Sequence, residues 1–210
     1  MLISDSHQFI FVHTRKAAGS SIRETLEPVS IQKPNTIISK LRSRVFLIEN
    51  DYRKFAFRQH SDIMSVKNIM PKELFEVYFK FSFVRNPWKR LVSEYEFIKR
   101  RPDHGRHKKL IKMTFNQYIV YQAKRHDAHQ IHMLADKNGK ILMDFIGRFE
   151  NLQEDWNFIC DEIGIENKQL SHRKKAGKVN YSNYYNDENK KLVTKLWEKD
   201  IDAFGYAYKD

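Results

Sequence analysis

Two stretches of the sequence combine residue types and spacings that suit chemistry on an anionic ligand. In the first, residues 16–21, a lysine precedes two alanines, a glycine and two serines. Backbone N–H groups and hydroxyls at the start of a helix bind anions, because the helix dipole favours negative charge there. The lysine adds a full positive charge beside them. The stretch therefore predicts a phosphate-binding corner, with a plain strand–helix turn as the alternative interpretation.

The second stretch is FSFVRNPWKRLVSEY, residues 81–95. Arg85 stands at the end of an apolar run that predicts a strand, and Ser93 lies about two turns into the helix predicted after it. A guanidinium group is a fork of donors suited to a phosphate. The alternative is that Arg85 pairs with a carboxylate and Ser93 is an exposed helix residue.

The first stretch is not a nucleoside-triphosphate loop of the Walker A type. That motif places a glycine before the lysine and a serine or threonine directly after it. Here Lys16 precedes Gly19, and Ala17 stands where the magnesium-binding hydroxyl would be. A P-loop-like nucleotide kinase is therefore kept only as an alternative function.

Together the two stretches resemble the donor-binding motifs of sulfotransferases. FVHTRKAAGSSI, residues 11–22, resembles the loop that holds the 5′-phosphosulfate, and FVRNPWKRLVSEY, residues 83–95, resembles the 3′-phosphate motif. Residues 144–165, DFIGRFENLQEDWNFICDEIGI, are similar to the segment that follows these motifs in the carbohydrate, or type 2, sulfotransferase family. The resemblance runs from about residue 9 to residue 206, with a variable stretch at 27–52.

The resemblance implies 3′-phosphoadenosine 5′-phosphosulfate (PAPS) as sulfate donor, adenosine 3′,5′-bisphosphate (PAP) as product and no metal. Arg85 and Ser93 would hold the 3′-phosphate. Lys16 would also stabilise the charge that develops on the leaving oxygen, as an electrostatic catalyst does. A basic late loop would close over the donor through Lys174, Lys175 and Gly177, with a solvated charge run as the alternative. The residues implied at the 5′ side are Arg15, Lys16, Ala17, Ala18, Gly19, Ser20 and Ser21, with Arg15 where a proline commonly stands.

The resemblance also implies a histidine base between the two donor motifs. His60 follows a strand predicted at 54–58, which would bring it to the same edge as the phosphate corner. An imidazole titrates near neutrality and can accept the proton of an attacking hydroxyl. A capping or surface histidine is the alternative. Glu150 is the alternative base, although we expect it to pair with Arg148 and support the site.

Alternating apolar runs and amphipathic stretches indicate the elements that position these residues. Strands are predicted at 9–13, 54–58, 78–85 and 142–149. Residues 29–35, 99–112 and 171–187 are predicted to be loops, the second of them a strongly basic exposed loop or helix end. Helices are predicted at 20–26, 63–70, 71–78, 89–100, 115–124, 152–163 and 186–204.

This alternation favours an α/β fold: one three-layer, P-loop-like domain over residues 1–210, with a mainly parallel central sheet flanked by helices. Ligands of such sheets bind beyond the carboxyl ends of the strands. Both anion corners are predicted at that edge.

Composition limits the other functions. The net charge of +12 should attract anions, but it does not distinguish among nucleic acid, a nucleotide, an acidic glycan and an anionic membrane as partner. No nucleic-acid-binding signature accompanies it, so a basic nucleic-acid module is kept as an alternative only. The single cysteine, Cys160, forms no internal disulfide and is expected in the core. The spacing of His126, His129 and His132 by three residues could suggest a metal site. No cysteine joins them and the pattern alone is weak, so we expect no metal.

The apolar runs are too short for a signal peptide core or a membrane span, so a cytoplasmic enzyme is expected, with peripheral membrane contact left open. The acceptor is expected to be a carbohydrate or glycoconjugate hydroxyl. Its identity and the oligomeric state stay open.

Overall fold

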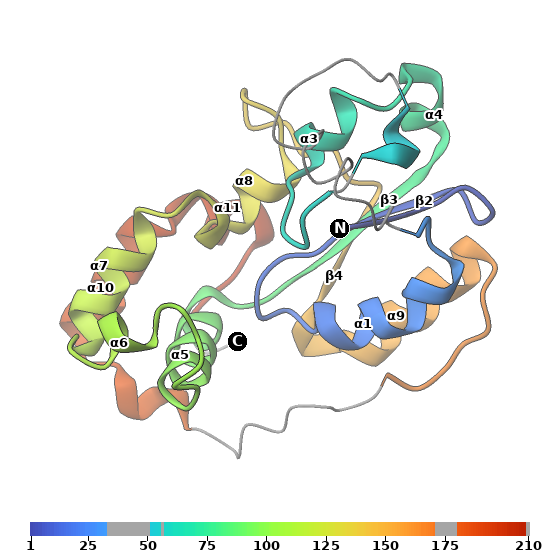
Figure 1. The fold of residues 1–210 in the computed structure, drawn as a ribbon. Coiled ribbons are helices and arrows are strands. Elements are labelled where there is room, and N and C mark those ends of the chain that lie inside the picture. The colour runs from blue at the N-terminus through green and yellow to red at the C-terminus, as the bar shows by residue number, and fades with distance from the viewer. Residues whose placement is uncertain (33–50, 56, 171–179, 209–210) are drawn as a thin grey trace.

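A four-stranded sheet forms the centre of the molecule (Figure 1). The structure is a computed structural model that describes residues 1–32, 51–55, 57–170 and 180–208. The strands lie side by side in the order β1 (Leu2–Ser4), β2 (Phe9–Val12), β3 (Phe79–Val84) and β4 (Phe145–Arg148). β1 runs antiparallel to β2, and β2, β3 and β4 are parallel. The predicted mainly parallel sheet is confirmed.

The register of the parallel strands brings their carboxyl ends to one edge of the sheet. Val12 of β2 is paired with Ser82 of β3, and Val84 of β3 is paired with Arg148 of β4. The chain segments that leave these three strands therefore start close together. They carry the phosphate corner, Arg85 and Glu150.

Side chains alternate between the two faces of the sheet, and helices cover both faces. Phe9 and Phe11 of β2 pack with Phe81 and Phe83 of β3 beneath the apolar faces of α1 (Gly19–Leu26) and α9 (Leu152–Ile163). Ile10 and Val12 point to the opposite face, which is covered by α3 (Ile63–Lys67), α4 (Lys72–Val77), α5 (Pro87–Lys99) and α8 (Gln130–Leu134). Figure 1 shows α1 and α9 together on one side of the strands, with α3 and α4 on the other. The three-layer arrangement is confirmed.

Local sequence explains several helix boundaries. Asn86 caps α5 by accepting from the N–H groups of Trp88 and Lys89, and Pro87 follows at the first helical position. Gly164 ends α9 in the left-handed conformation. The remaining helices, with the 3₁₀ turns written η, are α1 (Gly19–Leu26), η1 (Glu27–Val29), η2 (Tyr52–Lys54), α3 (Ile63–Lys67), α4 (Lys72–Val77), α5 (Pro87–Lys99), α6 (His107–Leu110), α7 (Phe115–Ala123), η3 (His126–Ala128), α8 (Gln130–Leu134), η4 (Phe149–Asn151), α9 (Leu152–Ile163), η5 (Tyr181–Tyr184), α10 (Asp187–Leu196) and α11 (Glu198–Phe204).

Two sequence predictions about elements are wrong. The described residues of 54–58 form no strand; a 3₁₀ turn ends at Lys54, and Phe55 and Phe57 pack their rings together 4.8 Å apart. The helix predicted at 186–204 is two helices, because the chain turns at Trp197, whose indole is buried and donates to the carbonyl of Ala128. Both errors arise from tertiary packing of aromatic side chains.

None of the helices in the described ranges is long and apolar enough to span a membrane.

Candidate active site

A pocket of about 1310 Å³ opens at the carboxyl edge of the sheet. Its walls come from the loop after β2, the start of α1, the ends of β3 and β4, and the side of α5 that faces them. The predicted site residues found among its lining are Arg15, Lys16, Ala18, Gly19, Ser20, Ser21, His60, Arg85, Ser93 and Glu150.

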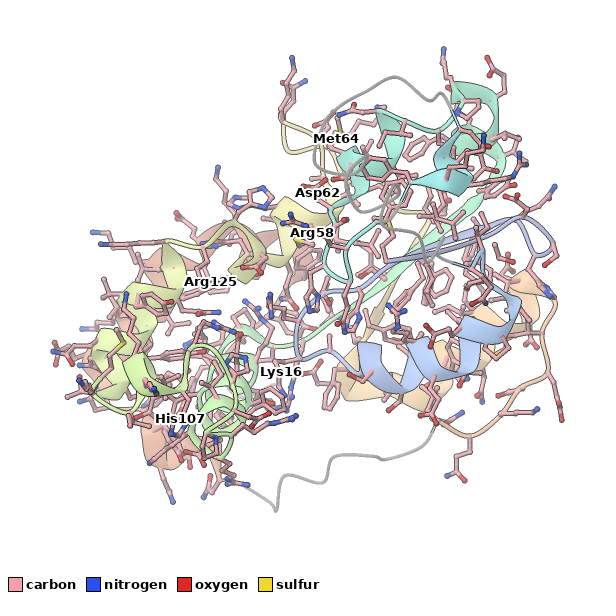
Figure 2. All side chains as sticks on the ribbon, in the orientation of Figure 1. Lys16, Arg58, Asp62, Met64, His107 and Arg125 are labelled. Atoms are coloured by element: carbon pink, nitrogen blue, oxygen red, sulfur yellow. The ribbon has the colours of Figure 1, made fainter. Side chains whose placement is uncertain are left out.

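The loop between β2 and α1 has an unusual backbone. Lys16 and Ala18 both have positive φ angles, 63° and 60°, although neither is a glycine. Residues held in this region cost free energy, and such positions cluster at ligand sites. The Nζ atom of Lys16 lies 4.1 Å from the centre of the Phe97 ring of α5. Figure 2 shows Lys16 between α5 and the start of α1.

Gly19, the first residue of α1, lies against the imidazole ring of His13. A Cβ atom built on Gly19 would be 2.0 Å from Cδ2 and 2.1 Å from Nε2 of that ring. A side chain at position 19 therefore requires His13 to move. The lack of room for a side chain therefore explains the glycine at position 19. Backbone conformation does not, because the φ angle of Gly19 is not in the left-handed region.

Arg85 forms no ion pair with a carboxylate among the described residues, although the charge of Glu150 acts on it. Its guanidinium lies 4.0 Å from the centre of the Phe149 ring, and Nη1 donates to the carbonyl of Lys16 over 3.3 Å. Its Nε atom is buried and has no hydrogen-bond partner within the described ranges. Burial lowers the pKa of Arg85 to about 10, so the group stays charged at neutral pH. A charged donor without a partner suits an anionic ligand.

Gln130 fixes the backbone of Arg85. The Arg85 N–H donates to Oε1 of Gln130 over 2.8 Å, and Nε2 of Gln130 donates to the Arg85 carbonyl over 2.9 Å. Gln130 is only 1% exposed. Asp200 of α11 accepts from the backbone N–H groups of Gln130 and Ile131, both over 2.9 Å. The end of β3 is thus held by a helix distant in sequence.

The wall next to Ser93 contains a buried ion pair. Ser93 lines the pocket, and its neighbour Glu94, 2% exposed, accepts from Arg106 over 2.6 Å and from Gln122 over 2.8 Å. Burial is the largest single influence on the Glu94 carboxyl and raises its pKa. The charge and hydrogen bond of Arg106, with the charges of Arg90 and Arg15, together outweigh it, so the pKa lies below its usual value. Arg106 and His104 belong to the basic stretch 99–112, which is therefore not a wholly exposed loop.

His60 reaches the pocket without the strand that was predicted to carry it. Its Nδ1 atom lies 2.9 Å from the carbonyl oxygen of His13, so Nδ1 carries the proton and Nε2 is left as the acceptor. Burial lowers the pKa of His60 below 6.5, and the His13 hydrogen bond opposes that shift. His60 is therefore neutral at physiological pH.

Glu150 does not pair with Arg148, and that prediction is wrong. Glu150 accepts from the N–H of Asn86 over 3.2 Å and from the hydroxyl of Tyr206 over 3.1 Å. Arg148 donates instead to the carbonyl of Phe204 over 2.5 Å. Glu150 is exposed at the rim of the pocket.

The other predicted residues fall into three groups. Arg15 lines the pocket, but its Nε donates to Asp127 over 2.7 Å, while Ala17 is buried beneath the loop. Lys174, Lys175 and Gly177 lie outside the described residues. The rings of His126 and His129 lie 5.1 and 4.8 Å from that of His132, and the described part of the chain holds no group of three side chains able to bind a metal.

Sequence reasoning missed His13 and Gln130. His13 precedes Lys16 by three residues and ends the strand predicted at 9–13, and a histidine at the end of an apolar strand is itself a signal. Gln130 had no signal, because its role depends on a contact between residues 45 positions apart.

A mainly parallel sheet flanked by helices, with a pocket at its carboxyl edge, is a P-loop-like α/β fold. Residues 1–207 match the model of the sulfotransferase family. The chain belongs to this family, as the resemblance of the motifs indicated.

Individual relatives agree with this assignment. The chain is 27% identical to carbohydrate sulfotransferase 14 of Danio rerio over 192 residues, which is 78% of this chain and 48% of that protein. It is 24% identical to the Mus musculus protein of the same name over 78% of this chain and 46% of that one. The chain thus spans about half the length of these two relatives. It is also 32% identical to an uncharacterized protein of Archaeoglobus fulgidus, over 48% of this chain and 79% of that protein.

A solved structure supports the fold. Mouse sulfotransferase SULT7A1, complexed with PAP, has a TM-score of 0.57 at 12% identity, covering 95% of this chain and 86% of that one. At this identity the likeness shows the fold alone.

Proposed function

We propose that the protein transfers a sulfuryl group from PAPS to a hydroxyl of a carbohydrate or glycoconjugate. The observation that carries the proposal is one pocket lined by the loop with Lys16, by Arg85 with Ser93, and by a neutral histidine, His60. Family membership favours the same reaction. The relatives named carbohydrate sulfotransferase 14 motivate the carbohydrate acceptor.

The residues of the pocket fit a donor with two separated anionic groups. The loop N–H groups, Ser20 and Ser21 would bind the 5′ side at the start of α1. The guanidinium of Arg85, with its buried unpartnered Nε, would bind the 3′-phosphate together with the Ser93 hydroxyl. The Phe149 ring already contacts Arg85 and restricts its orientation.

Two side chains would act on the transfer itself. The bond from sulfur to the bridging phosphate oxygen breaks while a bond from the acceptor oxygen to sulfur forms. Lys16 would stabilise the negative charge on the leaving oxygen. His60 would take the acceptor proton on Nε2, the nitrogen left free by its bond to the His13 carbonyl. No step is assigned to a metal, because the lysine supplies the positive charge that the leaving group needs.

Thermal unfolding with candidate ligands tests the donor class. A ligand at a hundred times its Kd stabilises a protein by about 2.7 kcal/mol, which raises the Tm by roughly 5–10 °C for a chain of this size. PAP is expected to give this shift. ATP with Mg²⁺ and short duplex DNA are expected to give much smaller shifts, and equal stabilisation by ATP would favour a nucleotide kinase instead.

Incubation with [³⁵S]PAPS and a panel of acceptors tests the transfer and its acceptor. The panel contains neutral oligosaccharides, acidic glycosaminoglycan fragments and lipid-linked sugars. Label in a carbohydrate product supports the proposal. Label only in non-carbohydrate acceptors would retain the sulfotransferase reaction and reject the carbohydrate class.

A further inference from the structure

His13 lies between the phosphate corner and His60. It follows β2 directly, is 4% exposed and lines the pocket. One edge of its ring abuts Gly19 at the start of α1. The centre of its ring lies 4.7 Å from that of His60, in an edge-on arrangement. His13 therefore contacts both the loop assigned to the donor and the base assigned to the acceptor.

The hydrogen bonds of His13 define its tautomer. Nδ1 lies 3.3 Å from Nε2 of Gln59, which is an amide donor, so Nδ1 is the acceptor of that bond. Burial, followed by the nearby His60, holds the pKa of His13 well below its usual value. A neutral imidazole with an acceptor Nδ1 carries its proton on Nε2.

The Nε2 atom is the part of the ring turned toward the loop. The position of a Cβ on Gly19 would be 2.1 Å from it. None of the described residues accepts a hydrogen bond from Nε2. His13 lines the pocket, and an N–H donor at a binding site without a protein partner is commonly completed by the ligand.

We propose that Nε2–H of His13 donates a hydrogen bond to a sulfuryl oxygen of the donor during transfer, as a further catalytic residue. The inference rests on the proposed function. In the proposed transfer, sulfur would pass from an oxygen near the loop to an oxygen near His60, and the ring of His13 lies between the loop and His60. A neutral donor fixed there in advance stabilises charge on the sulfuryl group without needing to reorganise.

Two substitutions separate this role from packing. The side-chain amide of His13→Gln can place an N–H near the position of Nε2, whereas that of His13→Asn reaches only the position of Nδ1. Both replacements are polar and smaller than or similar in size to histidine, so both fit beside Gly19. His7→Asn is the matched control, because His7 does not line the pocket. Its Nδ1 atom lies 2.9 Å from the carbonyl oxygen of Ile163.

The measurements are single-turnover transfer from PAPS to the acceptor found with labelled donor, and calorimetric binding of PAP, which lacks the sulfuryl group. We expect His13→Asn to lower the transfer rate about 10²–10³-fold, the effect of losing one such donor. His13→Gln should stay within about tenfold of wild type, and His7→Asn should match it. PAP affinity should change less than about threefold in all three variants.

The outcomes that overturn the inference differ from those that overturn the proposed function. A wild-type rate for His13→Asn, or an equal loss for His13→Gln and His13→Asn, removes the donor role of Nε2. A parallel loss of Tm, PAP affinity and rate assigns His13 to packing. Failure of the wild-type protein to bind PAP or to transfer sulfate rejects the function itself.

Discussion

Lys16 is a residue whose contribution should depend on the stage of the reaction. Its ammonium would meet a charge that develops only as the bond to the leaving oxygen breaks. We expect Lys16→Ala to lower turnover about 10²–10³-fold while weakening PAP binding about tenfold or less. Single-turnover rates and calorimetry on the same variant measure both effects. Equal losses in turnover and PAP affinity would make Lys16 a binding residue only.

His60 should set the pH dependence of the rate. A general base works only when deprotonated, and burial lowers the pKa of His60 below its usual value. The rate at low acceptor concentration should therefore rise with pH, and the midpoint of the rise should lie below about pH 6.5, the ordinary histidine pKa. His60→Asn should lose about 10²–10⁴-fold in turnover and retain PAP binding. Near-wild-type turnover in His60→Asn would point to Glu150 instead.

Gly19 and His13 should be coupled in stability. Gly19→Ala gains helix propensity, but its methyl group would overlap the His13 ring at 2.0 Å, and overpacking of this kind costs about 1–3 kcal/mol. We expect the single variant to be less stable and the double variant Gly19→Ala with His13→Ala to recover part of the loss. Urea unfolding of the four proteins of the cycle gives the coupling free energy. Additive effects would mean that the two residues do not share this space.

At the scale of elements, α8 should control the geometry of the 3′-phosphate corner. Gln130 at its start makes both backbone hydrogen bonds of Arg85. Gln130→Leu should move the guanidinium and weaken PAP binding about tenfold, since each lost hydrogen bond is worth about 0.5–1.5 kcal/mol. The matched control is Gln117→Leu, which removes a side-chain bond to the Thr114 N–H away from the pocket. Calorimetry should find unchanged PAP affinity in the control, and a loss of the same size there would refute the positioning role.

The elements that the sequence predicted well are those with a strong local signal. The strand ending at Arg85 and the helix ending at Gly164 have long apolar patterns with a clear stop signal. The loop after β2 was predicted from its residue types alone, and its positive φ angles at Lys16 and Ala18 have no sequence signal, because neither residue is a glycine. β1 was missed because it has only three residues at the antiparallel edge.

The arrangement of the site was less accessible from sequence than its residue types. His60 was placed at the pocket for the wrong reason, because a bond to the His13 carbonyl holds it there instead of a strand. Arg148 ends β4 and Glu150 lies in the 3₁₀ turn that follows, and their side chains bond to different partners, Phe204 of α11 and Tyr206 after it. Such pairings depend on contacts across the fold that periodicity does not encode.

At the scale of the molecule, two core clusters share one sheet, and the pocket lies at the edge where helices from both faces meet. The prediction of one domain over residues 1–210 stays a prediction, as does the cytoplasmic location. The net charge of +12 is a property of the whole chain that should affect how fast an anionic donor arrives. It should affect departure much less, because the contacts of the bound state are local.

We therefore expect the association rate of PAP to fall roughly tenfold between about 20 and 200 mM ionic strength, as the Debye length shortens from about 20 to 7 Å. The dissociation rate should change less than about threefold.

The double variant Lys195→Glu with Lys199→Glu changes two exposed residues away from the pocket lining. Each substitution replaces a positive charge by a negative one, so the net charge falls from +12 to +8. It should slow association at low salt and leave dissociation unchanged. Lys195→Arg with Lys199→Arg keeps the charge and is the matched control. Stopped-flow binding gives both rates, and a salt effect confined to dissociation would assign the electrostatics to contacts inside the pocket instead of the field of the whole molecule.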